Sequence, residues 1–208
     1  MSILVLGIFD GVHLGHRAVI ESAVNKGEVD VFTFSAQTMQ IKKGEDLEYI
    51  YSESQRAELL RNLGARQIRS SDFGDFKNKL PEEFVKEVIA GQFQGVCVGG
   101  DFRFGKGGLA DVEKLREFGK IHGFDVYILP DVFKGGYAVS SKRIRQHLKN
   151  GEIAQANELL GGNYHIKSEV MYGNRLGNTI GFPTINQYFE DYVLKPRFGV
   201  YAGKVYRN

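Results

Sequence analysis

Apolar residues follow two alternating patterns over the first three quarters of the chain. Short aliphatic or aromatic runs predict buried strands at Ile3–Leu6, Val29–Phe34, Gln67–Ser70, Gly95–Val98 and Val126–Leu129. Apolar residues at helical spacing predict a helix beginning at Gly15 and others at Ser54–Leu63, Pro81–Ala90 and Asp111–His122. Such alternation is typical of a mostly parallel, doubly wound α/β sheet, whose ligand crevice lies at the carboxyl ends of the strands.

The pattern changes after about Gly161. Residues Tyr164–Met171 have strand propensity, glycines recur at 173, 177 and 181, and Phe198–Val205 returns to β character. We therefore expect the beginning of a small all-β module of at most three strands.

Composition sets broad bounds. The chain has 208 residues, 42% hydrophobic and 25% charged, with a formal net charge of +2. This charge gives no reason to expect nucleic acid or a membrane as the main partner. The single cysteine, Cys97, lies in an apolar run, which favours a buried structural thiol over a nucleophile. No apolar stretch approaches the ~20 residues of a membrane helix, and Met1 leads directly into a strand, so we expect a cytoplasmic protein.

The most informative segment joins the first predicted strand to the first helix. Residues 7–16 read GIFDGVHLGH, and His13 and His16 would lie on one side of the first helical turn. Free backbone N–H groups and the positive end of the helix dipole favour a phosphate there, and two imidazole donors would complete an anion pocket. The structural alternative is that one histidine caps the turn and the other faces solvent.

A glycine-rich turn follows the strand Gly95–Val98. Residues 98–108 read VGGDFRFGKGG, and one Asp, one Arg and two aromatic rings in such a turn can meet a planar ring and a phosphate together. Glycine-rich loops alone are weak indicators, and Phe102 or Phe104 could equally pack in the core.

A third segment opens another helix. Residues 139–145 read VSSKRIR, and the helix runs to Asn150, with its two serines as candidate N-caps. Arg143 and Arg145 lie two positions apart and cannot both face one site.

These segments together resemble a known group. Residues 7–16 are similar to the (H/T)xGH signature of nucleotidylyltransferases, in the form found in bacterial FAD synthetases. Residues 98–108 and 139–145 resemble that group's glycine-aromatic segment and its Ile-Ser-Ser-Thr-x-x-Arg signature, and 55–60, 83–85 and 151–161 also echo the family. The resemblance implies a Rossmann-like nucleotidylyltransferase domain. It implies ATP contacts at Gly7, Phe9, Asp10, Gly11, His13, Gly15, His16, Ser140, Ser141 and Arg145, with His13, His16 and Arg145 catalytic, and flavin contacts at Asp101, Phe102, Arg103, Phe104 and Gly105.

The C-terminal residues resemble a second module. Residues 181–186, GFPTIN, and 198–202, FGVYA, are similar to the riboflavin kinase module fused behind the adenylyltransferase in bifunctional FAD synthetases. The resemblance implies two domains: an FMN adenylyltransferase over 1–160 and a partial riboflavin kinase-like β module over 161–208. In that module Thr184 and Asn186 would position Mg²⁺ and ATP phosphates. The kinase's later strands and acidic base would lie beyond residue 208, so we expect no kinase activity.

The chain departs from the family pattern at several positions. Ser35–Thr38 stands where an Asp-Pro-His-Pro-like turn is common, so flavin contacts there are open. Lys142 replaces a Thr, which removes a hydroxyl and adds a positive charge. Asn178 and Ile185 replace the kinase module's Arg and Ala.

The resemblance implies an FMN adenylyltransferase, which transfers AMP from ATP to FMN to give FAD and pyrophosphate, with Mg²⁺ on the triphosphate. The expected partners are the small molecules ATP and FMN, and the oligomeric state is left open. Three alternatives remain: another adenylyl- or cytidylyltransferase, a fragment of a bifunctional riboflavin kinase/FAD synthetase, and a non-catalytic flavin- or nucleotide-binding regulatory protein.

Overall fold

A five-stranded parallel sheet forms the centre of the molecule. The computed structural model describes residues 1–40, 48–171, 173, 181 and 184–206. The strands lie in the order β3-β2-β1-β4-β5, so β1 pairs with both β2 and β4. They are β1 (Ser2–Leu6), β2 (Glu28–Phe34), β3 (Ala65–Ser71), β4 (Gly95–Gly99) and β5 (Asp125–Leu129). The predicted doubly wound α/β sheet is confirmed, and strand order reverses at β1, where such folds form their ligand crevice.

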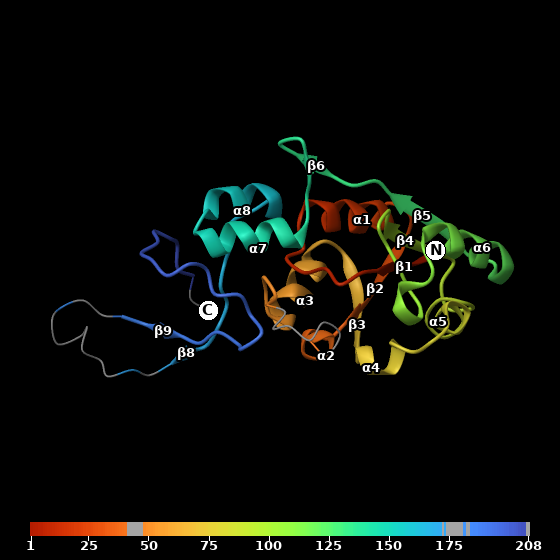
Figure 1. Ribbon diagram of the computed structural model, residues 1–208, viewed down its shortest axis with the longest axis horizontal. Helices are drawn as coiled ribbons and strands as arrows, with labels where there is room; N and C mark the ends of the chain where they lie inside the picture. The colour runs from red at the N-terminus through yellow and green to blue at the C-terminus, as the bar shows by residue number, and fades with distance from the viewer. Residues whose placement is uncertain (41–47, 172, 174–180, 182–183, 207–208) are drawn as a thin grey trace.

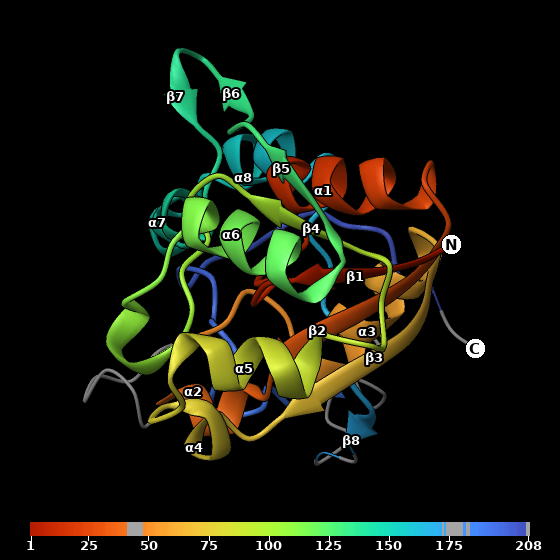
Figure 2. The ribbon, with the colours of Figure 1, turned by 90° about the vertical axis from the view of Figure 1, so that its right-hand side faces the viewer.

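Helices cover both faces of the sheet because both faces of its central strand are apolar. In β1, Ile3 and Val5 pack with helices α1 (Leu14–Val24) and α3 (Glu53–Asn62). Leu4 and Leu6 pack on the other face. There they meet α5 (Pro81–Val88) and α6 (Val112–His122), the side that faces the viewer in Figure 2. The predicted buried thiol is confirmed, since Cys97 is fully buried among the α1-side residues and burial raises its pKa to about 11.

The helix ends follow local sequence signals. Ser52 and Asp111 cap α3 and α6 with side-chain oxygens that accept a backbone N–H of the first turn. Pro81 begins α5, as predicted from its fixed φ and missing donor. Helix α7 (Ser141–Asn150) is followed by the C-cap residue Gly151, whose φ of +80° suits glycine.

Several short elements were not predicted from the sequence. They are α2 (Ala36–Gln40), α4 (Phe73–Phe76), the 3₁₀ turn η1 (Lys106–Gly108), the hairpin β6 (Phe133–Lys134) and β7 (Tyr137–Ala138), and α8 (Ile153–Leu160). The β6–β7 hairpin projects from the body of the molecule (Figure 1). Except for α8, which is as long as the predicted α5, these elements carry too few residues to show a hydrophobic period.

The C-terminal β predictions hold only in part. The described strands there are β8 (Val170–Met171) and β9 (Asn186–Gln187), which pair antiparallel and reach away from the sheet (Figure 1). The strand predicted over Tyr164–Met171 is wrong for residues 164–169, because only Val170 and Met171 form a strand. The beginning of this segment instead contacts α3, where the Gln55 amide donates to the His165 carbonyl and Lys167 pairs with Glu58.

The strand predicted over Phe198–Val205 is wrong. These residues carry no strand, and Phe198 and Val200 are 97% and 101% exposed. Strand propensity takes effect only when a neighbouring strand supplies backbone partners and a surface to pack on, and the described residues provide neither here. The predictions on Gly177 and Asn178 lie outside the described residues.

A C-terminal segment packs onto the first 160 residues. The Tyr49 N–H donates to the Tyr192 carbonyl, and the Leu194 N–H donates to the Tyr49 carbonyl, both at 2.7 Å. Leu194 is fully buried with Ile50 and residues of α7 and α8. The division at residue 160 remains a prediction. Within the described ranges, no helix is long and apolar enough to cross a membrane.

Candidate functional site

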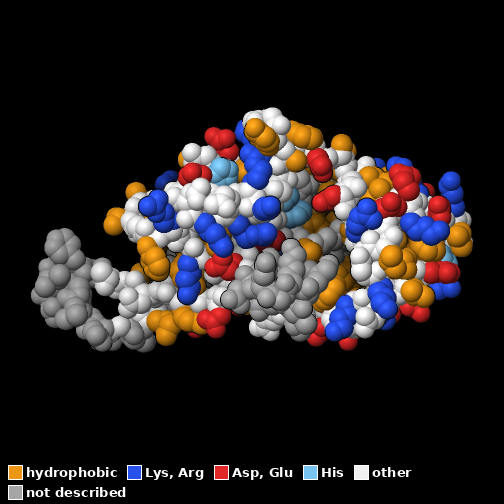
Figure 3. Space-filling view, viewed as in Figure 1, with side chains coloured by type: hydrophobic (Ala, Val, Ile, Leu, Met, Phe, Trp, Pro, Cys, Tyr) orange, Lys and Arg blue, Asp and Glu red, His pale blue; other side chains and the backbone are white. Residues whose placement is uncertain are grey.

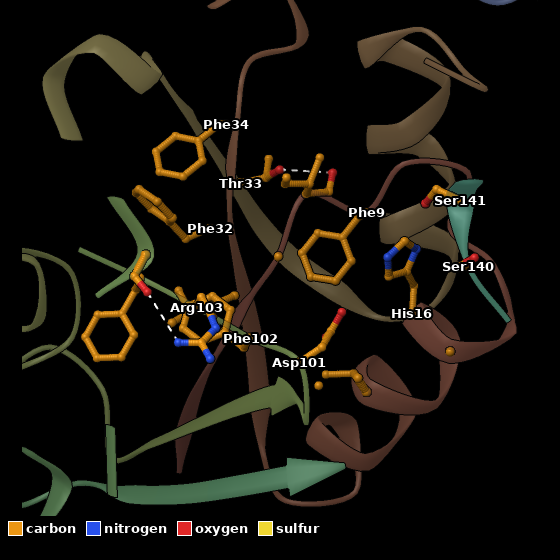
Figure 4. A pocket seen from close by; sticks show the side chains of 18 of the residues that line it. Phe9, His16, Phe32, Thr33, Phe34, Asp101, Phe102, Arg103, Ser140 and Ser141 are labelled. Atoms are coloured by element: carbon orange, nitrogen blue, oxygen red, sulfur yellow. Dashed lines mark hydrogen bonds between the residues drawn. The ribbon is translucent and has the colours of Figure 1, made fainter. Parts of the chain in front are cut away.

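A cavity of about 590 Å³ opens at the carboxyl ends of β1, β2 and β4. Twelve of the residues predicted for substrate binding line it: Gly7, Phe9, His13, Gly15, His16, Asp101, Phe102, Arg103, Phe104, Gly105, Ser140 and Ser141. Three predicted residues, Asp10, Gly11 and Arg145, are not among the residues that line it. Figure 4 shows aromatic rings on one side of the cavity and His16 with the two serines on the other.

The turn between β1 and α1, here called the Gly7–His13 turn, has a strained backbone. Phe9 and Val12 have φ values of +54° and +42°, which side chains other than glycine rarely adopt. Gly11 has a φ of +84°, and a Cβ there would lie 2.7 Å from the Ile50 side chain. A Cβ on Gly15 would lie 3.2 Å from the His13 ring, so glycine lets the helix start close against the imidazole.

The two histidines stack at the start of α1. Their ring centroids are 3.6 Å apart and their planes differ by 14°. His13 is the N-cap, and its Nδ1 accepts the His16 N–H at 3.4 Å, so the capping alternative holds for this residue. The other half of that alternative is wrong, because the His16 Nδ1 is buried without a hydrogen-bond partner among the described residues. An orphaned polar nitrogen beside free helix N–H groups leaves room for a polar ligand.

Both imidazoles are neutral at pH 7. Burial lowers the pKa of His13 to about 4, and burial with the nearby His13 and Arg56 holds the pKa of His16 well below 6.5. Neutral rings stack without mutual repulsion. A triphosphate placed against them would favour their charged forms and raise both pKa values.

Acid should therefore destabilise the fold through His13. The unfolded His13 ring takes a proton near pH 6.5, whereas the folded ring does so only near pH 4. The stability that the neutral ring contributes is therefore fully present above pH 6.5 and is lost as the pH falls toward 4. We expect the unfolding free energy of His13→Asn, which keeps a capping oxygen but does not titrate, to change less with pH. The wild type should lose up to about 3 kcal/mol relative to the variant between pH 6.5 and 4.

Urea unfolding at several pH values measures this difference. Asp10 has the opposite effect on the pH dependence of stability, because its raised pKa favours the folded state on acidification. Since Asp10 is present in both proteins, its effect cancels in the difference between wild type and variant. Parallel pH profiles for wild type and variant would contradict the assignment.

Asp10 connects the Gly7–His13 turn to three other segments. Its carboxylate accepts the Ile50 N–H at 2.8 Å and pairs with the Arg145 guanidinium. Its carbonyl accepts the Ser141 hydroxyl at 2.8 Å. Burial raises the pKa of Asp10 to about 6, against the opposing attraction of Arg145. In this structure Asp10 therefore fixes the start of α7 against the turn and does not face the cavity.

The start of α7 places its polar side chains in different directions. The Ser140 hydroxyl caps the helix by accepting the Arg143 N–H at 3.4 Å, as predicted for one of the two serines. Arg143 donates to the carbonyls of Tyr137 and Ala138, whereas Arg145 pairs with Asp10, so the two arginines do not share a site. Figure 3 shows Lys and Arg side chains gathered over α7, beside a hollow in which histidine is visible.

The far side of the cavity is aromatic. Phe102 and Phe104 stack with a centroid separation of 5.7 Å. Both rings line the cavity and also pack against the core, so the site role and the core-packing role predicted as alternatives are compatible. Asp101 reaches from the loop after β4 toward the region between Phe9 and His16 (Figure 4). The remaining rings on this side, Phe32, Phe34, Phe73, Phe76 and Phe84, were not predicted as site residues.

Further residues escaped prediction because their partners are distant in sequence. Thr33 donates to the Ile8 carbonyl at 3.3 Å, and the buried Arg56 donates to the same carbonyl at 2.8 Å. Phe32 and Phe34 alternate with Thr33 in β2, which the sequence does show as a period of two. A buried arginine on the apolar side of a helix gives no comparable signal.

No group of three or more His, Cys, Asp or Glu side chains within the described ranges could hold a metal ion by itself. Thr184 and Asn186, the predicted kinase-module positions, are exposed and lie by the β8–β9 ribbon, outside the cavity lining.

Comparisons with known proteins match both parts of the chain. The family model described as FAD synthetase matches residues 1–143. The chain belongs to the FAD synthetase family. A second model, riboflavin kinase, matches residues 160–208 of this family member.

Curated relatives of this FAD synthetase family member carry the same two descriptions. A bifunctional riboflavin kinase/FMN adenylyltransferase from Listeria monocytogenes is 35% identical and aligns with 97% of this chain and 67% of its own length. A protein from the same organism described as FAD synthetase is 29% identical, and the alignment covers 96% of this chain and 80% of that protein. A solved structure described as a macrolide-efflux protein from Streptococcus pneumoniae superposes with a TM-score of 0.81 at 28% identity, over 95% of this chain and 67% of that one.

Proposed function

We propose that the chain is an FMN adenylyltransferase, which transfers AMP from ATP to FMN and releases pyrophosphate. The observation that carries the proposal is the cavity with two unlike sides. One side combines a helix N-terminus, two imidazoles and two hydroxyls, a set suited to phosphates, and the other is a wall of phenylalanine rings suited to a flavin ring. Membership of the FAD synthetase family supports the same assignment.

The reaction needs alignment more than covalent catalysis. An oxygen of the FMN phosphate attacks the α-phosphorus of ATP, a new P–O bond forms, and the bond to the bridging oxygen breaks as pyrophosphate leaves. We assign His13 and His16 to the triphosphate, where they meet charge that grows on the leaving group. Ser140 and Ser141 seat the phosphates, and Asp101 orients a substrate.

Arg145 has two roles in this proposal. Its pairing with Asp10 fixes the start of α7 against the Gly7–His13 turn, and its guanidinium, with the side chain 22% exposed, supplies positive potential to the triphosphate.

Mg²⁺ would enter with the triphosphate. This ion usually keeps several waters and takes one or two carboxylates together with substrate phosphates. The cavity lining fits that demand, because it contains the carboxylates of Asp101 and Asp131 and no larger acidic cluster within the described part of the chain. When bound, Mg²⁺ would neutralise phosphate charge, and Asp101 would help to hold it.

The kinase-like module is the second part of the proposal. We propose a division near residue 160, where the riboflavin kinase match begins, whereas the FAD synthetase match ends earlier, at residue 143. The riboflavin kinase match gives no support to the expected absence of kinase activity, so riboflavin belongs in the assay as a second flavin.

Flavin chromatography tests the proposal. Purified protein with ATP, Mg²⁺ and FMN should convert FMN to FAD, whereas protein without ATP should leave FMN unchanged. Riboflavin in place of FMN reports on phosphorylation by the second module. Binding of ATP and FMN without FAD formation would support the non-catalytic alternative and would overturn the proposal.

A further inference from the structure

Arg56 is a buried arginine that the reaction proposed above does not use. It lies on α3 and is only 3% exposed. Its nearest carboxylate among the described residues is Glu53, with an N–O distance of 3.6 Å, and Glu53 already accepts the Ala36 N–H at 2.6 Å. A charged side chain is rarely this buried unless hydrogen bonds replace its water.

The hydrogen bonds of Arg56 go to backbone carbonyls of two residues that line the cavity. One terminal nitrogen donates to the Ile8 carbonyl at 2.8 Å and the other to the Phe34 carbonyl at 3.1 Å. Ile8 follows β1 and Phe34 ends β2, which are neighbouring parallel strands, and both residues line the cavity. The planar guanidinium therefore bridges two strand ends, one leading to the histidines and the other to the aromatic wall.

The Ile8 carbonyl stands directly before the strained part of the Gly7–His13 turn. Phe9 follows it at a φ of +54°, and the turn closes through the Val12 N–H on the Phe9 carbonyl at 3.1 Å. Strained backbone of this kind persists only where surrounding contacts determine it. Arg56 provides the shorter of the two side-chain hydrogen bonds to Ile8, and Thr33 provides the other.

We propose that Arg56 is a positioning residue for adenylyl transfer, which holds the Gly7–His13 turn through Ile8 and the flavin side of the cavity through Phe34. The inference rests on the proposed function for its effect on rate and on the structure alone for its effect on the turn. A lysine could not reproduce it fully, because an ammonium is a point donor and lacks the planar fork that spans two carbonyls.

Two measurements on Arg56→Gln test the proposal. The kcat for FAD formation should fall at least about tenfold at a temperature where circular dichroism shows the variant fully folded. Hydrogen exchange of the Val12 amide should accelerate about tenfold or more, while amides in the middle of α6 keep their rates. Arg56→Lys should fall between wild type and Arg56→Gln in both readouts.

Val88→Ala serves as the control for general destabilisation. It truncates a buried core residue on α5 that does not line the cavity. It should lower the melting temperature yet keep kcat and the Val12 exchange rate within about twofold of wild type. If Arg56→Gln kept both values within twofold, or if Val88→Ala reproduced both losses, Arg56 would have only a structural role. A wild-type protein that makes no FAD would overturn the proposed function instead, and the exchange measurement would still decide the role of Arg56.

Discussion

Replacing His16 with alanine should reduce the rate of FAD formation by about 10² or more. Its imidazole lies in the cavity wall, its Nδ1 has no partner in the described structure, and its ring stacks on His13. Removal of one preorganised donor from a site of developing negative charge typically costs this much. The measurement is kcat with saturating ATP, Mg²⁺ and FMN.

His147→Ala provides the matched control. That histidine lies at the other end of α7, where its Nδ1 contacts Glu152 at 2.6 Å, outside the cavity lining. Its loss should leave the rate within about twofold, since this partly exposed pair lies outside the cavity and such pairs contribute little. Near-normal turnover in His16→Ala would show that the histidine pair is not the phosphate site.

Replacing Arg145 with alanine should lower both activity and stability. The variant leaves the Asp10 carboxylate buried beside the Ile50 N–H without its cation, which should reduce the unfolding free energy at pH 7 by about 3 kcal/mol. The rate of FAD formation should fall about 10²-fold, because the same guanidinium supplies charge to the leaving pyrophosphate. Urea unfolding and the FAD assay measure the two effects.

A double variant separates these effects. Asp10→Asn combined with Arg145→Ala keeps an acceptor for Ile50 but removes the buried charge, so it should regain most of the lost stability and remain slow. Arg143→Ala is the control on the same helix, because its guanidinium contacts the hairpin carbonyls of Tyr137 and Ala138 and the Tyr137 ring, outside the cavity lining. The rate of this variant should stay within a few-fold of wild type. A double variant with restored activity would show that Arg145 acts only by neutralising Asp10.

The sheet and its principal helices could be predicted because their signals are local. The run Ile3–Leu6 has apolar side chains on both faces, which is what a parallel strand covered by helices requires. The turn after it follows from its glycines, and the segments after β1 and β4 meet because those strands are neighbours. Family resemblance then supplied the residue roles.

The remainder depends on contacts that no local pattern contains. The burial of Asp10 is set by Ile50 and Arg145, which are 40 and 135 residues away along the chain. Arg56 acts through the carbonyls of Ile8 and Phe34, and carbonyls carry no sequence signal. The strand prediction at Phe198–Val205 is wrong because a local signal lacks its distant partner. The segment has β propensity, but the described residues offer no neighbouring strand with which it could pair.

Transfer of labelled phosphorus from ATP tests the central claim most directly. Protein incubated with FMN, Mg²⁺ and ATP labelled at the α-phosphate should place the label in FAD and release one pyrophosphate for each FAD formed. Label that stays in ATP, or that appears only in AMP or ADP with FMN unchanged, would contradict adenylyl transfer to the flavin.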